Sequence, residues 1–189
     1  MKQRRLSHAI GFDDCPFDRS HRGDVGIVGA VFSNNRLDGI LMGKVRRDGA
    51  NSSARITRMI EASRFSQHLH LIMLQGIALA GFNVVDVFSL HRRTGLPILV
   101  VARRKPDLQG VREALITRVS GGQKKWRIIE RLGAMEPIHN AWVQRIDLSL
   151  DEAADVIGRF AIHGSIPEPL RIAHLVAGGI GSGESRGRV

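Results

Sequence analysis

The first fifty residues follow the two-residue alternation of apolar and polar positions that β-strands show. Residues 7–12, 24–32 and 37–46 each predict a strand, and the first ends at Asp13 and Asp14. The sequence Ser-Asn-Asn-Arg at 33–36 is typical of a hairpin turn. Because the connections between these strands are short, the three strands are expected to form an antiparallel meander.

Beyond about residue 50 the period changes, and helical stretches alternate with short apolar runs. The predicted elements are a helix over 52–68, a strand over 69–74, a helix over 83–93, a strand over 96–102 and a helix over 106–119. Ser52 or Ser53 can cap the first helix and Asn83 the second. Alternating strands and helices favour strands that run parallel, so those ending at 74 and 102 are expected to lie parallel to the first strand.

The rest of the chain predicts mostly helices. Residues 124–132 look helical, 139–146 resemble a strand, and 150–162 and 167–177 predict two C-terminal helices. Ser149 and Glu152 have the spacing of a capping box. Residues 1–178 are therefore expected to form one domain, and the Gly, Ser and Arg-rich stretch 179–189 a flexible tail.

This order of elements predicts the fold class. An α/β protein with three antiparallel strands, then β-α units and C-terminal helices, fits a ribonuclease H-like mixed sheet. A generic doubly wound sheet is the alternative. The length of 189 residues is that of one domain.

The charge balance points to a polyanionic partner. The chain has 28 Lys and Arg against 18 Asp and Glu, a net charge of +10, which favours nucleic acid; a basic surface without such a partner is the alternative. With no Tyr and two Trp, contacts to the phosphate backbone are favoured over base stacking. The pattern predicts no particular oligomeric state.

Composition also bears on the compartment. Cys15 is the only cysteine, so no intrachain disulfide can form, and a reducing compartment is favoured. No apolar stretch approaches the roughly 18 residues of a membrane helix, and the N-terminus lacks the long apolar core of a signal peptide. The expectation is a cytoplasmic protein with no membrane partner.

Polar residues collect where the predicted strands end. They are Asp13 and Asp14 after the first strand, Asp48 after the third, Gln75 after the fourth, and Arg103, Arg104 and Lys105 after the fifth. Ligands of parallel sheets bind at the carboxyl ends of the strands. Magnesium prefers carboxylate oxygens, so Asp13, Asp14 and Asp48 are candidate metal ligands. The alternative is that these aspartates only terminate strands and turns.

Several motifs resemble a known family. Gly-Phe-Asp-Asp at 11–14, the blocks at 71–76 and 94–104, and the segment 166–174 are similar to endonuclease V. Over nearly the whole length the chain resembles a sister family of endonuclease V-like proteins called domain of unknown function ninety-nine. That resemblance rests on the motifs at 11–14, 81–86 and 167–169.

The resemblance implies a magnesium-dependent endonuclease that cuts near deaminated adenine. Asp13 would be the first metal carboxylate and Asp48 the second acidic position. Arg103 or Arg104 would lie near the scissile phosphate, and His174 beside the metal. The expected nucleic-acid contacts are Arg103, Arg104, Lys105 and Arg171, although Arg171 could instead pair with Glu168.

Two departures separate the chain from endonuclease V. Gln75 stands where that family has a carboxylate, and an uncharged amide is a poor magnesium ligand. No tyrosine-containing wedge is present, so recognition of inosine is not carried over. The leading hypothesis is a nucleic-acid-directed magnesium-dependent phosphodiesterase with weak metal binding. The alternatives are a non-catalytic nucleic-acid-binding protein and a hydrolase of a small phosphorylated molecule.

Overall fold

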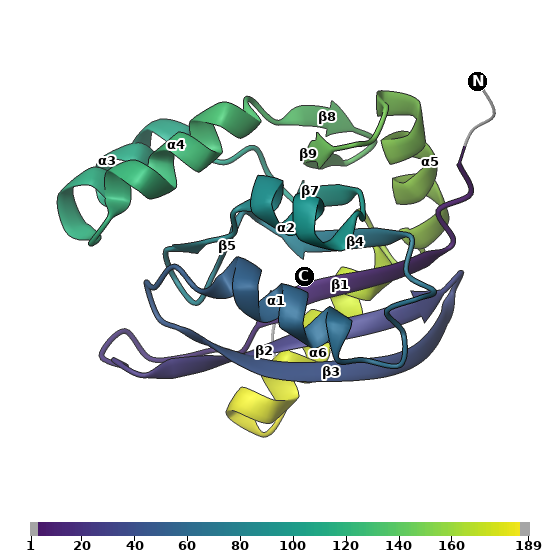
Figure 1. Ribbon diagram of the computed structural model, residues 1–189, viewed down its shortest axis with the longest axis horizontal. Helices are drawn as coiled ribbons and strands as arrows, with labels where there is room; N and C mark the ends of the chain where they lie inside the picture. Colours follow the sequence, from purple (N-terminus) through teal and green to yellow (C-terminus); the bar gives the residue numbers. More distant parts are fainter. Residues whose placement is uncertain (1–3, 186–189) are drawn as a thin grey trace.

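A seven-stranded mixed sheet forms the centre of the computed structural model, which describes residues 4–185 (Figure 1). The strands in spatial order are β3 (Arg36–Arg46), β2 (Asp24–Ser33), β1 (His8–Asp14), β4 (Leu71–Gln75), β7 (Ile98–Ala102), β9 (Ala141–Ile146) and β8 (Glu136–Ile138). β1, β2 and β3 are antiparallel, and β4 and β7 run parallel to β1, as predicted. β9 is antiparallel to β7 and β8.

Within residues 4–185, six helices and a small second sheet complete the fold. The helices are α1 (Ser52–Glu61), α2 (Val87–Thr94), α3 (Leu108–Arg118), α4 (Gly122–Leu132), α5 (Leu150–Phe160) and α6 (Glu168–Ser182). The second sheet pairs β5 (Ala78–Leu79) with β6 (Asn83–Val84). The helices formed by residues 4–185 include none long and apolar enough to cross a membrane.

The core consists of two layers, one on each face of the sheet. Along β1, Ala9 packs into the layer that contains residues of α5 and α6, whereas Ile10 and Phe12 pack into the layer beside α1 and α2. This alternation is the pleat of a strand that is buried on both faces. A third, smaller cluster joins α3 and α4 to the segment around β5 and β6.

Some predicted boundaries are wrong, for local reasons. The helix expected over 52–68 ends at Glu61, because the Ser63 hydroxyl donates to the carbonyl of Ile60 and accepts from the N–H of Phe65. The helix expected from Asn83 begins at Val87, and its cap is Asp86, whose carboxylate accepts from Ser89 N–H at 3.0 Å.

The C-terminal elements need a similar correction. The predicted capping box at Ser149 and Glu152 is confirmed. The last helix continues to Ser182, so residues 179–182 belong to α6 and not to the tail predicted from 179 onward. Residues 186–189 of that tail lie outside the described part of the chain. Residues 120–148 supply α4, β8 and β9.

Helix α6 approaches β1 so closely that only glycine fits between them. A Cβ atom on Gly11 would lie 2.4 Å from the backbone carbon of Pro169 and 2.7 Å from the backbone nitrogen of Leu170. Backbone atoms cannot move aside as a flexible side chain can, so the contact fixes the start of α6 on the middle of β1.

We therefore expect Gly11→Ala to destabilise the protein by about 3 kcal/mol, because the added methyl group forces α6 away from the sheet. Urea unfolding at constant pH measures the difference. Gly158→Ala is the control, since a Cβ there meets only His139 Nε2 at 3.8 Å, and it should be neutral or slightly stabilising. Equal stabilities of Gly11→Ala and the wild type would contradict the close packing of α6.

Candidate active site

A cleft of about 490 Å³ opens at the carboxyl ends of β1 and β4, beside the second half of α6. We call it the Asp13 cleft. Its lining residues are Asp13, Asp14, Cys15, Pro16, Phe17, Gln75, His174, Gly178, Ser182 and Glu184. The structure therefore brings together four of the residues singled out in the sequence, namely Asp13, Asp14, Gln75 and His174.

Asp13 is the most buried charged group of the cleft, with 7% of its surface exposed. It lies on the face of β1 that meets α6, and its Oδ2 is 2.8 Å from His174 Nδ1. Its Oδ1 accepts the N–H of Asp14 at 2.9 Å. Burial raises the pKa of Asp13, and the hydrogen bond to His174 acts in the opposite direction.

Asp14 points to the other face of β1, because successive residues of a strand alternate. Its Oδ2 accepts the N–H of Ala80 at 3.1 Å. Burial, and secondly the negative charge of Asp13, raise the pKa of Asp14 to about 6. Two adjacent carboxylates that are both partly desolvated form a site that would gain stability from a cation or a proton.

Gln75 contributes an unusual feature. It ends β4 next to β1, and its Oε1 is buried without a hydrogen-bond partner. Buried polar atoms normally have partners, so an orphaned oxygen in a cleft marks a position where a ligand can bind. An amide oxygen is a hard donor that magnesium and calcium accept, although it adds no charge.

The oxygen atoms that line the cleft are thus of the type that a divalent cation prefers as ligands. Asp13 and Asp14 offer carboxylate oxygens, and Gln75 offers the orphaned amide oxygen. Within residues 4–185, no group of three or more His, Cys, Asp or Glu side chains is placed to hold a metal ion. If a cation binds here, the oxygen of Gln75 would be the third protein donor, where a third carboxylate would give tighter binding.

Asp48, the third predicted metal ligand, is not part of the cleft. Asp48 has a positive φ of 52°, and its Oδ1 accepts the N–H of Phe82 at 2.8 Å. Its Oδ2 lies 3.2 Å from Arg47 Nε. The structure thus places the carboxylate of Asp48 on the turn at Phe82 and outside the lining of the cleft, and a metal site shared with Asp13 stays a prediction.

The predicted basic contacts lie outside the cleft lining. Arg103, Arg104 and Lys105 directly follow β7 and are exposed at the same edge of the sheet as the cleft. Lys105 Nζ lies 5.3 Å from the ring of Trp142. Arg171 forms two hydrogen bonds of 2.7 Å with Glu168, the pairing that the sequence left open. Contacts of these residues with nucleic acid stay predictions.

The sequence did not reveal several residues of the cleft. Ser182 and Glu184 fell within the predicted tail, yet both line it. They do so because α6 continues past Gly181, where a Cβ atom would lie 2.8 Å from Pro16 Cδ. Cys15 also lines the cleft, and burial raises the pKa of its thiol, which favours the protonated form. The glycine-rich composition alone could not show this packing.

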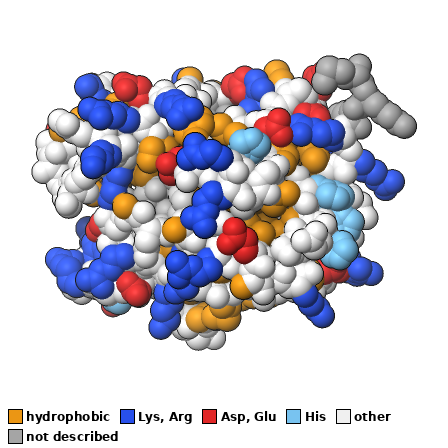
Figure 2. All heavy atoms as spheres, in the orientation of Figure 1, with side chains coloured by type: hydrophobic (Ala, Val, Ile, Leu, Met, Phe, Trp, Pro, Cys, Tyr) orange, Lys and Arg blue, Asp and Glu red, His pale blue; other side chains and the backbone are white. Residues whose placement is uncertain are grey.

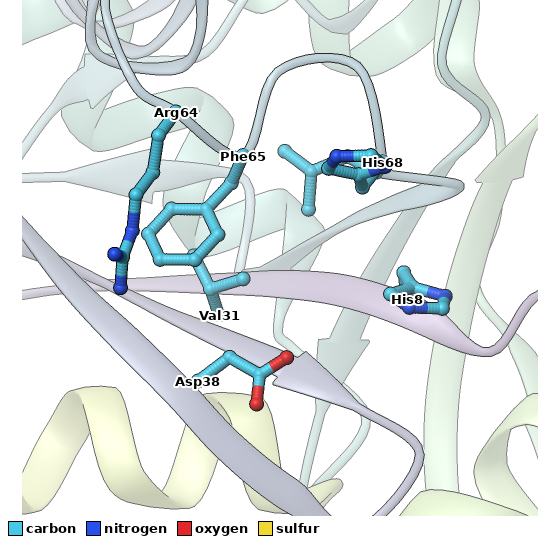
Figure 3. A pocket seen from close by; sticks show the side chains of 7 residues that line it. His8, Val31, Asp38, Arg64, Phe65 and His68 are labelled. Atoms are coloured by element: carbon cyan, nitrogen blue, oxygen red, sulfur yellow. The ribbon is translucent and has the colours of Figure 1, made fainter.

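A second cavity, of about 290 Å³, lies at the other end of β1 (Figure 3). His8, Asp38, Arg64, Phe65 and His68 surround it. His8 is the first residue of β1, whereas Asp13 and Asp14 are its last two. This cavity holds a single carboxylate, and that carboxylate pairs with Arg36, so it is a poorer cation site than the Asp13 cleft.

The fold and the cleft together define the class of this protein. It has a ribonuclease H-like fold, with acidic residues at the carboxyl edge of the sheet. Endonuclease V of Ciona intestinalis, in complex with a 24mer DNA containing an inosine followed by a ribo-adenosine, shares the fold with a TM-score of 0.57. The match is 13% identical and covers 89% of this chain and 83% of that chain. This comparison confirms the predicted fold class.

The chain belongs to the endonuclease dU family, whose model matches residues 5–181. A UPF0215 protein of Deinococcus radiodurans is 56% identical over 184 residues, which cover 97% of this chain and 94% of that protein. The crystal structure of a protein of unknown function from Archaeoglobus fulgidus has a TM-score of 0.85 and 32% identity, covering 92% of this chain and 97% of that chain. The name domain of unknown function ninety-nine stays a prediction.

The raised pKa of Asp14 has a consequence for stability without metal. Between about pH 4 and pH 6 the unfolded chain releases the Asp14 proton while the folded chain keeps it, so stability falls as pH rises through this window. Asp14→Asn should match the wild type at pH 4 and exceed it by about 1 to 3 kcal/mol at pH 7.5. Urea unfolding in the presence of a chelator measures both values.

Asp18→Asn is the matched control, since Asp18 is exposed a few residues away. It should show the same small difference from the wild type at both pH values. A stability difference for Asp14→Asn that does not change between pH 4 and pH 7.5 would show that Asp14 is not held in a desolvated, negatively charged site.

Proposed function

We propose that this protein is a nucleic-acid-directed, magnesium-dependent phosphodiesterase whose reaction takes place in the Asp13 cleft. The observation that carries the proposal is the convergence of Asp13, Asp14, His174 and the orphaned oxygen of Gln75 in one cleft at the carboxyl edge of the sheet. Membership of the endonuclease dU family and the shared fold with endonuclease V support it.

The cation would be held by Asp13 and Asp14, with the Gln75 oxygen completing the protein donors. When bound, magnesium would withdraw electron density from the scissile phosphoryl group. With one neutral donor among three, its affinity should be low, and the raised pKa of Asp14 should make binding weaker as pH falls below about 6.

His174 is suited to proton transfer. An ionised Asp13 can only accept hydrogen bonds, so it fixes the proton of His174 on Nδ1 at a distance of 2.8 Å. In the neutral imidazole with its proton on Nδ1, Nε2 is the acceptor and can take a proton from an attacking water molecule. The contact of α6 with Gly11 holds this pair in place, since His174 lies on the same helix as Pro169.

The distribution of charge supports a nucleic-acid partner. Residues 103–132, which follow β7 and include α3 and α4, contain nine Lys or Arg and three Asp or Glu, a net charge of +6. They therefore account for more than half of the surplus of the whole chain. Lys and Arg side chains are frequent over this part of the surface and continue across the face shown in Figure 2. A duplex at the cleft could contact them through its phosphates.

The substrate that we would test first is DNA that contains dU, because the family description names it. Strands with dU and matched strands with thymidine should be cleaved at different rates if the family description applies to this chain. The alternatives predict other outcomes: a non-catalytic nucleic-acid-binding protein would bind both strands and cleave neither. A hydrolase of small phosphorylated molecules would gain no affinity with strand length.

Metal binding gives the direct test of the cleft. Gln75→Glu keeps the side-chain length and adds a negative charge, so we expect magnesium to bind about tenfold more tightly, or about 1.4 kcal/mol. Titration calorimetry of the metal-stripped protein measures the change. Asp13→Asn in the same background should abolish the gain, whereas Gln75→Leu should bind magnesium more weakly than the wild type. An unchanged affinity in folded Gln75→Glu would place Gln75 outside the metal site.

Salt dependence tests the nucleic-acid partner. With about four to six phosphate contacts, the logarithm of the association constant for duplex DNA should fall with the logarithm of salt concentration with a slope of about −4 to −5. Replacing Arg104 and Lys105 by Ala should reduce the slope by about 2. Replacing Arg36 and Arg64, at the other end of the sheet, should leave it unchanged. Affinity that does not depend on salt would refute a phosphate-binding surface.

A further inference from the structure

The segment 80–82 between β5 and β6 lies against the cleft in a conformation that few sequences can adopt. Ala80 and Gly81 both have a positive φ, of 48° and 82°. We call residues 80–82 the Ala80 turn. A non-glycine residue such as Ala80 adopts this conformation at a cost, so the surrounding contacts must hold the turn in place.

Two carboxylates hold the Ala80 turn from opposite ends. The N–H of Ala80 donates to Asp14 Oδ2 at 3.1 Å, and the N–H of Phe82 donates to Asp48 Oδ1 at 2.8 Å. The backbone of Asp48 also contributes, since its N–H donates to the carbonyl of Ala80 at 3.0 Å. Asp48 therefore forms hydrogen bonds with both ends of the Ala80 turn. The N–H of Ala80 in the same turn donates to the carboxylate of Asp14.

Asp48 is itself firmly placed. Lys125 Nζ donates to the carbonyl oxygen of Asp48 at 2.6 Å, which links α4 to the end of β3. A Cβ atom on Gly81 would lie 2.4 Å from Asp48 Oδ1, so only glycine allows the carboxylate to reach the N–H of Phe82. Behind the turn, the buried amide of Asn83 donates to the carbonyl of Arg46 at 2.8 Å.

We propose that Asp48 is a positioning residue, which acts on the cleft through the Ala80 turn and does not touch the cation or the substrate. It holds the turn so that the N–H of Ala80 fixes one oxygen of Asp14 and thereby the orientation of the other. This inference rests on the proposed function, because it assigns a role at the same cleft. It also gives a physical reason for the Gly81, Phe82 and Asn83 motif.

The geometry separates this role from that of a metal ligand. A positioning residue needs an oxygen that accepts from Phe82 N–H, and Asn supplies one as well as Asp does. A metal ligand needs the negative charge, which Asn lacks. Asp48→Asn and Asp48→Ala should therefore differ if Asp48 acts through the turn, and should be equally impaired if it binds the ion.

The experiment compares four folded proteins: the wild type, Asp48→Asn, Asp48→Ala and Asp24→Ala. Asp24 is the matched control, because it is a carboxylate at the same end of the β2–β3 hairpin that pairs with Arg46 and does not contact the turn. Three quantities are measured: the exchange rate of the Ala80 and Phe82 amide hydrogens without metal, the affinity for magnesium, and kcat and KM for cleavage of DNA that contains dU.

In Asp48→Ala we expect the Ala80 amide to exchange at least about tenfold faster and magnesium affinity to fall by about tenfold. We expect kcat to fall by a similar factor with KM nearly unchanged, because the contacts with nucleic acid lie elsewhere. Asp48→Asn should recover most of each loss, and Asp24→Ala should behave as the wild type. Thermal unfolding of every variant checks that the fold is intact.

If Asp48→Ala does not fold, Gly81→Ala replaces it, since the added methyl group pushes the Asp48 carboxylate off the N–H of Phe82. Equal loss of magnesium affinity in Asp48→Asn and Asp48→Ala would overturn the proposal in favour of a direct ligand. Unchanged exchange of the Ala80 amide in Asp48→Ala would overturn it as well. Because exchange is measured without metal or substrate, a protein that cleaves nothing would refute the proposed function and leave this test valid.

Discussion

The backbone contact between α6 and β1 at Gly11 determines most of what surrounds the cleft. At this point the two elements approach within a distance that excludes a single methyl group. The approach places His174, later on the same helix, at 2.8 Å from Asp13 and brings Ser182 and Glu184 to the rim of the cleft. If side chains separated α6 from the sheet, as is usual, His174 would lie too far from Asp13 to form their hydrogen bond. The burial of Asp13, and with it the raised pKa of this carboxyl group, follows from the same contact.

The cleft is acidic at its centre in a chain with a surplus of basic residues. The basic residues 103–105 and the helices α3 and α4 follow β7 at the same edge of the sheet, so basic and acidic groups lie at one edge. Such an arrangement suits a polyanion whose phosphates bind around the cleft while a cation separates one phosphate from the carboxylates. The orphaned oxygen of Gln75 adds a donor and no charge.

The regular part of this architecture was predictable from the sequence, and the irregular part was not. The two-residue alternation of apolar positions predicted the three strands of the meander, and the alternation of apolar runs with helices predicted that β4 and β7 lie parallel to β1. It also brought Asp13, Asp14 and Gln75 to one edge. The surroundings of Asp48 could not be predicted, because they depend on the positive φ of Ala80 and Gly81 and on hydrogen bonds across 34 residues, which no periodicity records. The end of α6 was missed because glycine is read as a helix breaker, whereas Gly181 is required there for contact with Pro16.

Adjacent residues of a strand face opposite sides, and the last two residues of β1 are Asp13 and Asp14. One carboxylate is therefore attached to the layer of α6, through His174, and the other to the layer on the far side of the sheet, through Ala80. The two halves of the site thus have separate mechanical supports. A substitution that loosens α6 would disturb the contact between Asp13 and His174 and spare Asp14, whereas one that loosens the far layer would do the reverse. During evolution, residues that support one half of the site could therefore be replaced while the other half keeps its structure.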